Sequence, residues 1–281
     1  MRKRWWLIVL VVGVLWWLGS QGGPESKPHI ALVTCNGMIT DAEPWLYRLR
    51  EIEDDDQVMG MVLRIDSPGG GVAASQEMRD RLASFKKPWV VSMGNMAASG
   101  GLMIAAPAPH IFAQPATMTG SIGVIMILSD VSKLMEKIGI TSNVITAGTM
   151  KDAGSPFRPM NPDERAYLEG VAHTIHEDFI QQVARDRHLD PEALRPLADG
   201  RILIGSQAKE AGLVDELGGM LQAKAWLIAQ QGWDEGLDLV LHEERKPLLA
   251  RWMESAAGDL LPESTWIPSG WYAAWPGAVG G

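Results

Sequence analysis

The 281-residue chain is poor in cysteine, tyrosine and phenylalanine, and it has no excess of basic charge. Its single cysteine, Cys35, excludes a disulfide-stabilised fold and a cysteine-rich zinc site. Lysine and arginine number 25 against 34 aspartate and glutamate residues, a formal net charge of −9 that argues against a dedicated nucleic-acid-binding protein. Hydrophobic residues make up 46% and charged residues 21%, which is typical of a globular chain with a sizeable core.

The glycine motifs of nucleotide-binding proteins are also missing. No G-x-G-x-x-G follows a predicted strand, and Gly69–Gly71 is not followed by Gly-Lys-Ser/Thr. His173, His176 and Glu177 fall within about one helical turn, but without the His-Glu-x-x-His spacing of zinc peptidases, so we interpret them as an ordinary helix face. The sequence therefore predicts neither a cofactor nor a metal site.

The first residues have the pattern of a membrane-targeting segment. Basic Met1–Arg4 precedes an uncharged stretch, Trp5–Leu18, with tryptophan pairs at both ends, where the membrane interface favours them. As a helix this stretch would be about 21 Å long, shorter than the roughly 30 Å hydrocarbon core. We predict an uncleaved signal anchor over residues 1–20; a cleaved signal peptide and a buried core helix are the alternatives. The basic end should stay in the cytoplasm, which places the remainder on the extracytoplasmic side of the cytoplasmic membrane.

Composition divides the rest of the chain into three parts. Residues 21–27 have the glycine, proline and serine of a linker. Residues 28–241 alternate between apolar runs and helical patterns, and are predicted to form one domain. Residues 242–281 place tryptophans among proline and glycine, and are interpreted as a tail outside the α/β core.

Alternating strands and helices predict an α/β fold with a parallel sheet covered on both faces. Apolar runs predict strands at 29–34, 58–65, 88–93 and 143–146, and helical patterns predict helices at 42–54, 72–85, 97–106 and 130–137. A longer helix has the clearest start, with Asn161 as its N-cap, Pro162 at its first position and Glu164 completing a capping box. Its predicted apolar stripe contains Leu168, Val171, Ile175, Phe179 and Val183.

The strongest candidate nucleophile is Ser99, at the predicted junction of a strand and a helix. The backbone N–H groups there can face a developing negative charge, and neighbouring alanine and glycine leave room for a substrate backbone. Gly69–Gly71 follows another strand, and its unobstructed N–H groups suit an oxyanion hole. Ordinary tight turns are the alternative interpretation of both segments.

A nucleophilic serine needs a base, and histidine is not the best candidate here. His110 lies 11 residues after Ser99, and no other histidine has a motif-like setting. A desolvated lysine can serve instead. Lys151 falls in an irregular stretch, residues 146–156, which is the kind of segment that carries function; a solvated surface lysine is the alternative.

Taken together and in order, these segments resemble the bacterial signal peptide peptidase A family. The resemblance covers about residues 28–220, and its ordered motifs are Ser67-Pro68-Gly69-Gly70-Gly71, Met93-Gly94-x-Met96-Ala97-Ala98-Ser99-Gly100-Gly101, Thr119-Gly120-Ser121-Ile122-Gly123-Val124, Lys151-Asp152-x-x-Ser155-Pro156, Ala198-Asp199-Gly200-Arg201 and Val214-Asp215-Glu216-Leu217-Gly218.

The resemblance implies a fold and a set of roles. The fold would be the Clp-protease/crotonase-like spiral of β-β-α units, following one transmembrane anchor. Ser99 would be the nucleophile and Lys151 the general base, with Ser121 orienting the lysine amine. The N–H groups of Gly70 and Ser99 would form the oxyanion hole. The substrate would bind along the glycines, which are Gly69, Gly70, Gly71 and Gly100.

The resemblance also implies assembly and a substrate class. The chain carries one set of motifs, as in the half-length form of the family, whose serine and lysine come from neighbouring protomers. The expected assembly is a homo-oligomer, with a dome-shaped octamer as precedent, acting on cleaved signal peptides and unfolded peptides at the membrane. Relatives with a Ser-His-Asp triad place histidine about 25 residues after the serine, where this chain has Gly123-Val124-Ile125.

Three other functions fit parts of the sequence. A crotonase-type acyl-CoA enzyme would share the oxyanion hole, but it would not need Ser99 or an anchor. A phage-type capsid-maturation protease would share the dyad but not the anchor. A non-catalytic peptide-binding membrane protein would require a degenerate site, whereas the serine and the lysine are both present.

Overall fold

The computed structural model describes residues 27–242. The predicted anchor at 1–20 and the tail from residue 243 onward lie outside the described residues, so both stay predictions. Within 27–242, no helix combines the length and the apolar character that a bilayer crossing needs.

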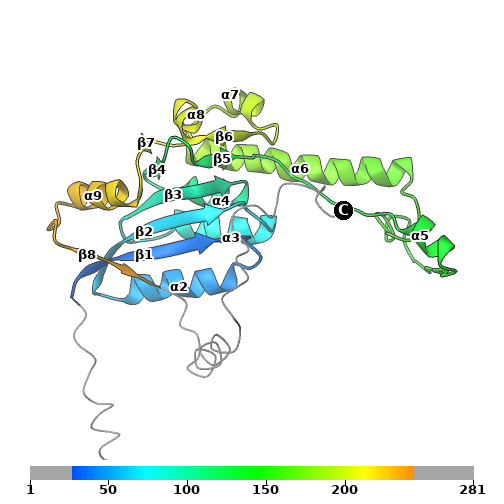
Figure 1. The fold of residues 1–281 in the computed structure, drawn as a ribbon, viewed down its shortest axis with the longest axis horizontal. Helices are drawn as coiled ribbons and strands as arrows, with labels where there is room; N and C mark the ends of the chain where they lie inside the picture. Colours follow the sequence, from blue (N-terminus) through cyan, green and yellow to red (C-terminus); the bar gives the residue numbers. More distant parts are fainter. Residues whose placement is uncertain (1–26, 243–281) are drawn as a thin grey trace, which may run out of the picture.

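A mixed sheet of eight strands forms the centre of the described chain (Figure 1). Its main path runs β6-β5-β3-β2-β1-β8, and β4 joins β3 to β7 beside that path. The pairings are parallel except that of β5 with β6, which is antiparallel. The strands are β1 His29–Asn36, β2 Val58–Ser67, β3 Trp89–Ala98, β4 Ile111–Ala113, β5 Met118–Gly120, β6 Ile202–Ile204, β7 Glu216–Leu217 and β8 Asp238–Leu241.

Helices follow most strands along the chain, as expected for parallel pairing. They are α2 Glu43–Asp54, α3 Val72–Ala83, α4 Gly100–Ala105, α5 Ser132–Lys137, α6 Pro162–Asp186, α7 Pro191–Leu194, α8 Gly205–Glu210 and α9 Met220–Gln231, with a 3₁₀ turn at Arg195–Leu197. The α/β class predicted from the sequence is confirmed, with a mixed sheet in place of a purely parallel one.

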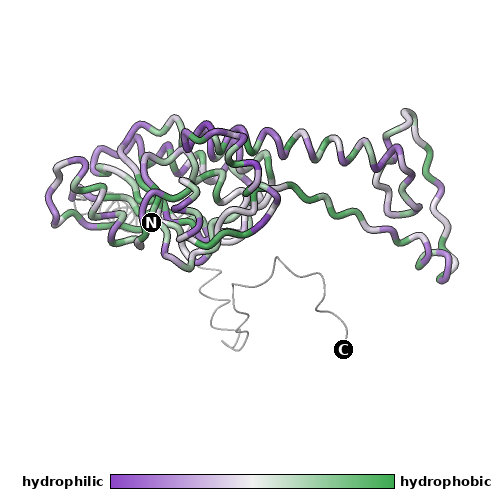
Figure 2. Tube along the Cα trace, turned by 90° about the horizontal axis from the view of Figure 1, so that it is seen from above, coloured by the Kyte–Doolittle hydropathy of each residue, from purple (hydrophilic) through white to green (hydrophobic). Residues whose placement is uncertain are grey.

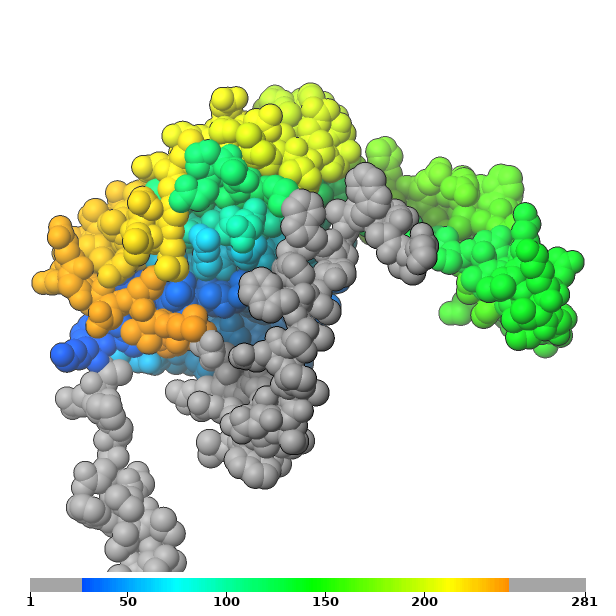
Figure 3. Space-filling model, in the orientation of Figure 1, coloured from blue at the N-terminus to red at the C-terminus, as the bar shows by residue number. Residues whose placement is uncertain are grey.

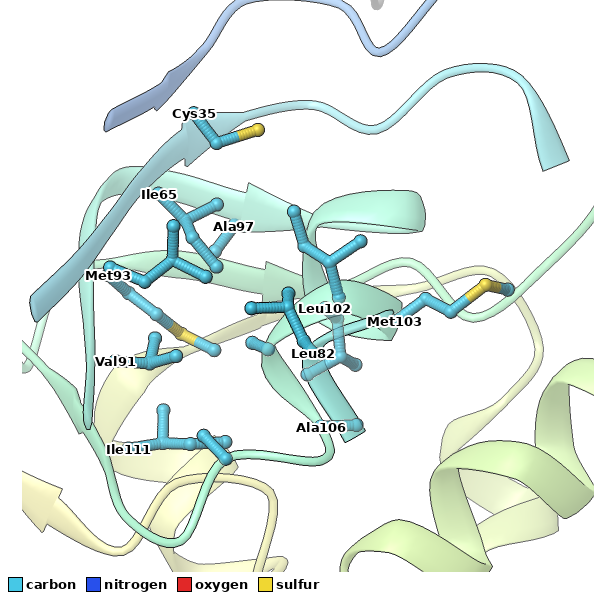
Figure 4. Close-up of a cluster of buried hydrophobic side chains, with 14 of the residues drawn as sticks. Cys35, Ile65, Leu82, Val91, Met93, Ala97, Leu102, Met103, Ala106 and Ile111 are labelled. Atoms are coloured by element: carbon cyan, nitrogen blue, oxygen red, sulfur yellow. The ribbon is translucent and has the colours of Figure 1, made fainter. Parts of the chain in front are cut away.

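Alternating side chains of the central strands divide the core between the two faces of the sheet. Met61, Leu63 and Ile65 of β2 belong to the larger cluster, which helices α2, α3 and α4 cover. Figure 4 shows the part of this cluster built around β2, β3 and α4. Val62 points to the other face and joins a smaller cluster under α9. Both faces of the sheet are therefore covered by helices.

The first two predicted strands and the helices after them are confirmed within a few residues. The strand predicted at 88–93 instead continues to Ala98, and the helix predicted from residue 97 begins at Gly100. Hydrogen bonds that Asn95 and Met96 donate to the Asp66 carboxylate hold the extra residues of β3 against β2, a long-range effect absent from local propensity. The prediction of a strand at 143–146 is wrong, because this segment is exposed and has no sheet partner among the described residues.

Helix α6 has the predicted start. Asn161 accepts the Glu164 N–H at 2.9 Å, and the Glu164 side chain accepts the Asn161 N–H at 3.2 Å, so both bonds of the capping box are present. The predicted stripe is fully buried only in the second half, from Phe179 onward. The start of α6 projects from the body of the protein together with α5 (Figure 1).

This projecting part, residues 123–161 with the start of α6, forms an arm on one side of the molecule (Figures 1 and 3). Figure 2 shows that its outgoing segment is hydrophobic over most of its length. Many of its apolar side chains are exposed, among them Ile125, Ile127, Leu134, Ile138 and Ile145, the last at 98%. Helix α5 buries none of its residues.

Candidate functional site

Ser99 lies where β3 ends and α4 begins, as predicted. It caps α4 with φ 53° and ψ −120°, a backbone conformation that a residue with a Cβ rarely adopts. Such a conformation costs on the order of 1–3 kcal/mol and persists only where surrounding structure imposes it. The strain marks this position as functional more clearly than the local sequence does.

A cleft with a volume of about 810 Å³ opens over Ser99. Of the residues predicted for the site, Gly69, Gly70, Ser99 and Ser121 line it together, although they come from separate segments of the chain. The far wall belongs to α6 and the segment after it. Its members are Glu169, Gly170, Ala172, His173, His176, Asp199 and Gly200.

The glycine run after β2 packs directly against the start of α4. Gly69 has φ +99°, and a Cβ on it would lie 2.6 Å from the Gly100 nitrogen and 2.8 Å from the Ser99 Cβ. The run is held by Ile39, whose N–H donates to the Gly69 carbonyl at 2.8 Å and whose carbonyl accepts the Gly71 N–H at 2.7 Å. Within the described residues the Gly70 N–H has no hydrogen-bond acceptor, so it stays available to a ligand in the cleft.

The Ser99 N–H is already in use. It donates to the Gly120 carbonyl at 2.9 Å and so extends the pairing of β3 with β5. This bond takes up one of the two donors that the resemblance assigned to the oxyanion hole. The next N–H, that of Gly100, is at the first position of α4, where a helix leaves its N–H groups unpaired, and it has no acceptor among the described residues.

Ser121 is the second strained serine of the cleft, with φ 51°. Its N–H donates to the Arg201 carbonyl at 2.7 Å, and the Gly200 N–H donates to the Ile122 carbonyl at 3.1 Å. These bonds explain the Ala198–Arg201 motif, whose role could not be read from the sequence: the motif fixes the backbone that presents Ser121. Hydrogen bonding from the Arg201 guanidinium lowers the pKa of Asp199 to about 2, so Asp199 is ionised and its charge is paired with that of Arg201.

Lys151 is not brought to Ser99 within one chain. It is exposed and belongs to the arm, and no lysine lines the cleft in the part of the chain that the structure describes. The single chain therefore presents the serine and the lysine at separate places.

The segment after Lys151 is nonetheless well held. Arg158 donates from Nε to the Asp152 carboxylate at 2.7 Å and from Nη2 to the Glu164 carboxylate at 2.6 Å. Hydrogen bonding from Arg158 lowers the pKa of Glu164 below its usual range. Arg158 thus ties the residue next to Lys151 to the first turn of α6.

Sequence reasoning missed the contribution of Asp66. Its carboxylate accepts hydrogen bonds from the Asn95 side chain at 2.9 Å and the Met96 N–H at 3.1 Å, and Gly94 packs so closely that a Cβ would lie 2.7 Å from it. The only available signal was an acidic residue immediately before Ser67-Pro68-Gly69. His173 and His176, interpreted from the sequence as an ordinary helix face, line the wall of the cleft; His176 bonds the Ala198 carbonyl at 2.7 Å, and Glu177 pairs with Arg195.

Comparison with known proteins identifies the family of this chain. Residues 81–233, more than half of the chain, match the family described as peptidase family S49. The chain belongs to peptidase family S49. The S49 match includes Ser99, Ser121 and Lys151.

Individual relatives agree with the S49 assignment. A Methanocaldococcus jannaschii protein named as a protease is 43% identical over 63% of this chain and 58% of its own length. A Synechocystis protein, also named as a protease, is 38% identical over 81% of this chain and 83% of its own length. An Enterococcus faecium protein named as a signal peptide peptidase is 36% identical over 69% of this chain and 61% of its own length. This chain therefore spans only about three fifths of two of these relatives.

A solved structure, that of a ClpP1 mutant from Listeria monocytogenes, is 19% identical and has a TM-score of 0.47. The superposition covers 67% of this chain and 91% of that one.

Proposed function

We propose that this S49 protein is a serine endopeptidase in which Ser99 attacks a peptide carbonyl and Lys151 of a neighbouring protomer accepts the serine proton. One observation carries the proposal: the strained Ser99 lies in a cleft that no lysine lines within the described residues, whereas Lys151 is exposed on an arm that leaves the body. An arm with exposed apolar side chains is suited to pack against another copy.

The reaction then runs in two steps at Ser99. The Ser99 hydroxyl gives its proton to the neutral lysine amine while its oxygen bonds to the peptide carbonyl carbon. The tetrahedral oxyanion accepts hydrogen bonds from the Gly70 and Gly100 N–H groups, which are the unpaired donors beside Ser99. The leaving amine takes the proton, and a water activated by the same lysine amine releases the acyl group from Ser99.

Desolvation explains why the lysine should come from a neighbour. An exposed lysine side chain is a poor base at neutral pH, because water stabilises its protonated ammonium form over the neutral amine. Insertion of the lysine into the cleft of another protomer would remove that water and bring the amine beside Ser121, whose hydroxyl can hold it. Assembly would therefore create the base as well as position it.

The membrane location and the substrates belong to the same proposal. The tryptophan-flanked segment at residues 1–20 supports a single anchor with the peptidase domain on the extracytoplasmic side. Cleaved signal peptides are the expected substrates because they are released at this membrane, and a relative is named for that activity. A homo-octamer is the expected assembly. Crosslinking in membranes tests the assembly, and cleavage of a synthetic signal peptide tests the substrate class.

Subunit mixing tests the shared site directly. Ser99→Ala and Lys151→Ala are each expected to be inactive, whereas oligomers containing both variants should regain activity, because some sites combine an intact Ser99 with an intact Lys151. Labelling of Ser99 by a fluorophosphonate probe is the readout, with the Ser99→Ala/Lys151→Ala double variant as the matched control. Mixed oligomers that stay unlabelled would exclude a site shared between protomers.

A further inference from the structure

A second, much smaller cavity opens off the cleft beside Ser99. Its volume is about 10 Å³, and Gly70, Ser99, Gly123 and Val124 line both it and the cleft. The two share the nucleophile and the Gly70 N–H, so this cavity lies within reach of the side chain on the acyl side of the scissile bond when a peptide carbonyl is bound at Ser99. The side pocket is defined here by Val72, Ser75, Met103, Val124, Ile175 and Phe179.

The walls of the side pocket come from three helices that are packed tightly. Met103 of α4 and Phe179 of α6 are each 3% exposed, so neither can easily move outward to enlarge the space. Figure 4 shows the Met103 side chain extending away from Val91 and Ile111, at the edge of the core cluster. Ser75 of α3 is 1% exposed and packs so closely that a Cβ on Gly100 would lie 2.3 Å from its hydroxyl oxygen.

The chemistry of the side pocket is apolar. Val72, Met103, Ile175 and Phe179 contribute hydrocarbon and thioether surface. The Ser75 hydroxyl donates to the Gly71 carbonyl at 2.9 Å, so its proton is already committed. A charged side chain entering here would lose its hydration without gaining a partner.

We infer that this protein cleaves peptides after very small apolar side chains, alanine above all, and that Met103, Ile175 and Phe179 set the size limit. A cavity of about 10 Å³ holds roughly one water molecule, which is close to the size of a methyl group. Leucine or phenylalanine would require displacement of Met103 or Phe179 from a close-packed core, where added methylenes are poorly tolerated. The inference rests on the proposed peptidase function, since it assigns the side chain bound at that same site.

The test is a matched set of peptides that differ only at the residue before the scissile bond, cleaved by the assembled full-length protein. Alanine should exceed leucine and phenylalanine in kcat/KM by about 100-fold or more, the range expected when a pocket rejects extra carbon atoms. Met103→Ala should reduce the alanine-over-leucine ratio at least tenfold by enlarging the side pocket. Ile175→Ala, on the more exposed half of α6, should act in the same direction if Met103→Ala does not fold.

Met78→Ala is the matched control. Met78 is a fully buried methionine of α3 that does not line the side pocket, so this variant should lose stability without a change in the ratio. Equal rates for alanine and leucine in the wild type would overturn the size limit but leave the peptidase proposal intact, as would an unchanged ratio in both pocket variants. An assembled protein that neither cleaves any peptide nor labels at Ser99 would overturn the peptidase proposal, and the size limit with it.

Discussion

The Asp66 carboxylate accepts a hydrogen bond from the Met96 N–H at 3.1 Å, where β3 bulges away from β2. Ile65 pairs with Met93 but Ser67 pairs with Ala97, so the β3 residues 94–96 face Asp66 alone. The side chain substitutes for missing strand partners, and the strand that it stabilises ends one residue before Ser99. Asp66 is therefore a positioning residue for the nucleophile.

Removal of this carboxylate should misplace Ser99 more than it unfolds the protein. Asp66→Ala is expected to slow fluorophosphonate labelling of Ser99 by about tenfold to 100-fold, because small displacements of a reacting group have effects of that size. Asp66→Asn keeps one oxygen for the Met96 N–H and should retain most of the rate. Labelling of Asp66→Ala at the wild-type rate would show that the β3 bulge keeps its structure, and positions Ser99, without the Asp66 carboxylate.

Lys151 should be irreplaceable by arginine. Arginine has a similar length and the same charge, but it does not deprotonate in proteins and cannot act as a base. Lys151→Arg, like Lys151→Ala, is expected to lose activity by several orders of magnitude, while it assembles like the wild type. The check is peptide hydrolysis together with light scattering; an active Lys151→Arg enzyme would contradict the lysine-base mechanism.

The apolar surface of the arm should control assembly and not folding. Ile145 is 98% exposed, so Ile145→Glu removes no buried contact of the single chain and should leave its melting temperature nearly unchanged. The same charge in an interface between protomers would be desolvated, and the oligomer should dissociate. Light scattering gives the mass, and Gln231→Glu at the end of α9 is the control for added charge. An intact Ile145→Glu oligomer would place the interface elsewhere.

The Arg158–Glu164 ion pair should make stability depend on pH in acid. Hydrogen bonding from Arg158 lowers the pKa of Glu164 in the folded state, so its contribution is fully present above the unfolded pKa of about 4.3. The contribution is lost as the pH falls through the folded value. Glu164→Gln keeps an acceptor for the capping box but not the charge.

Melting temperatures of wild type and Glu164→Gln should accordingly differ at pH 7 and converge below pH of about 4. A constant difference from pH 7 to pH 3 would mean that the pair contributes nothing through its charge.

The sequence predicted most of the parts that depend on local patterns. The capping box of Asn161 and Glu164 and the first two strands are present as expected, since capping and apolar runs are local signals. The short strands β4 to β8 were missed because strands of two to four residues are defined by distant partners. The prediction of a strand at 143–146 failed because an apolar run cannot show whether it will be buried within the chain.

The candidate site was likewise predicted only in the parts that motifs mark. Ser99, Ser121 and Gly70 could be placed together from ordered motifs, and they line one cleft. Two other features follow from long-range packing that no motif records. They are the hydrogen bond from the Ser99 N–H to the Gly120 carbonyl, and the cleft wall that contains Glu169 and His173.

The exposure of the arm has a consequence for local unfolding in this molecule. Helix α5 has six residues and buries none of them, and a helix of that length is not stable by itself in water. In a lone protomer its amides should exchange with solvent far faster than those of β2, whose side chains are largely buried. Slow amide exchange in the arm would then measure contact with a neighbour, residue by residue, without reference to catalysis.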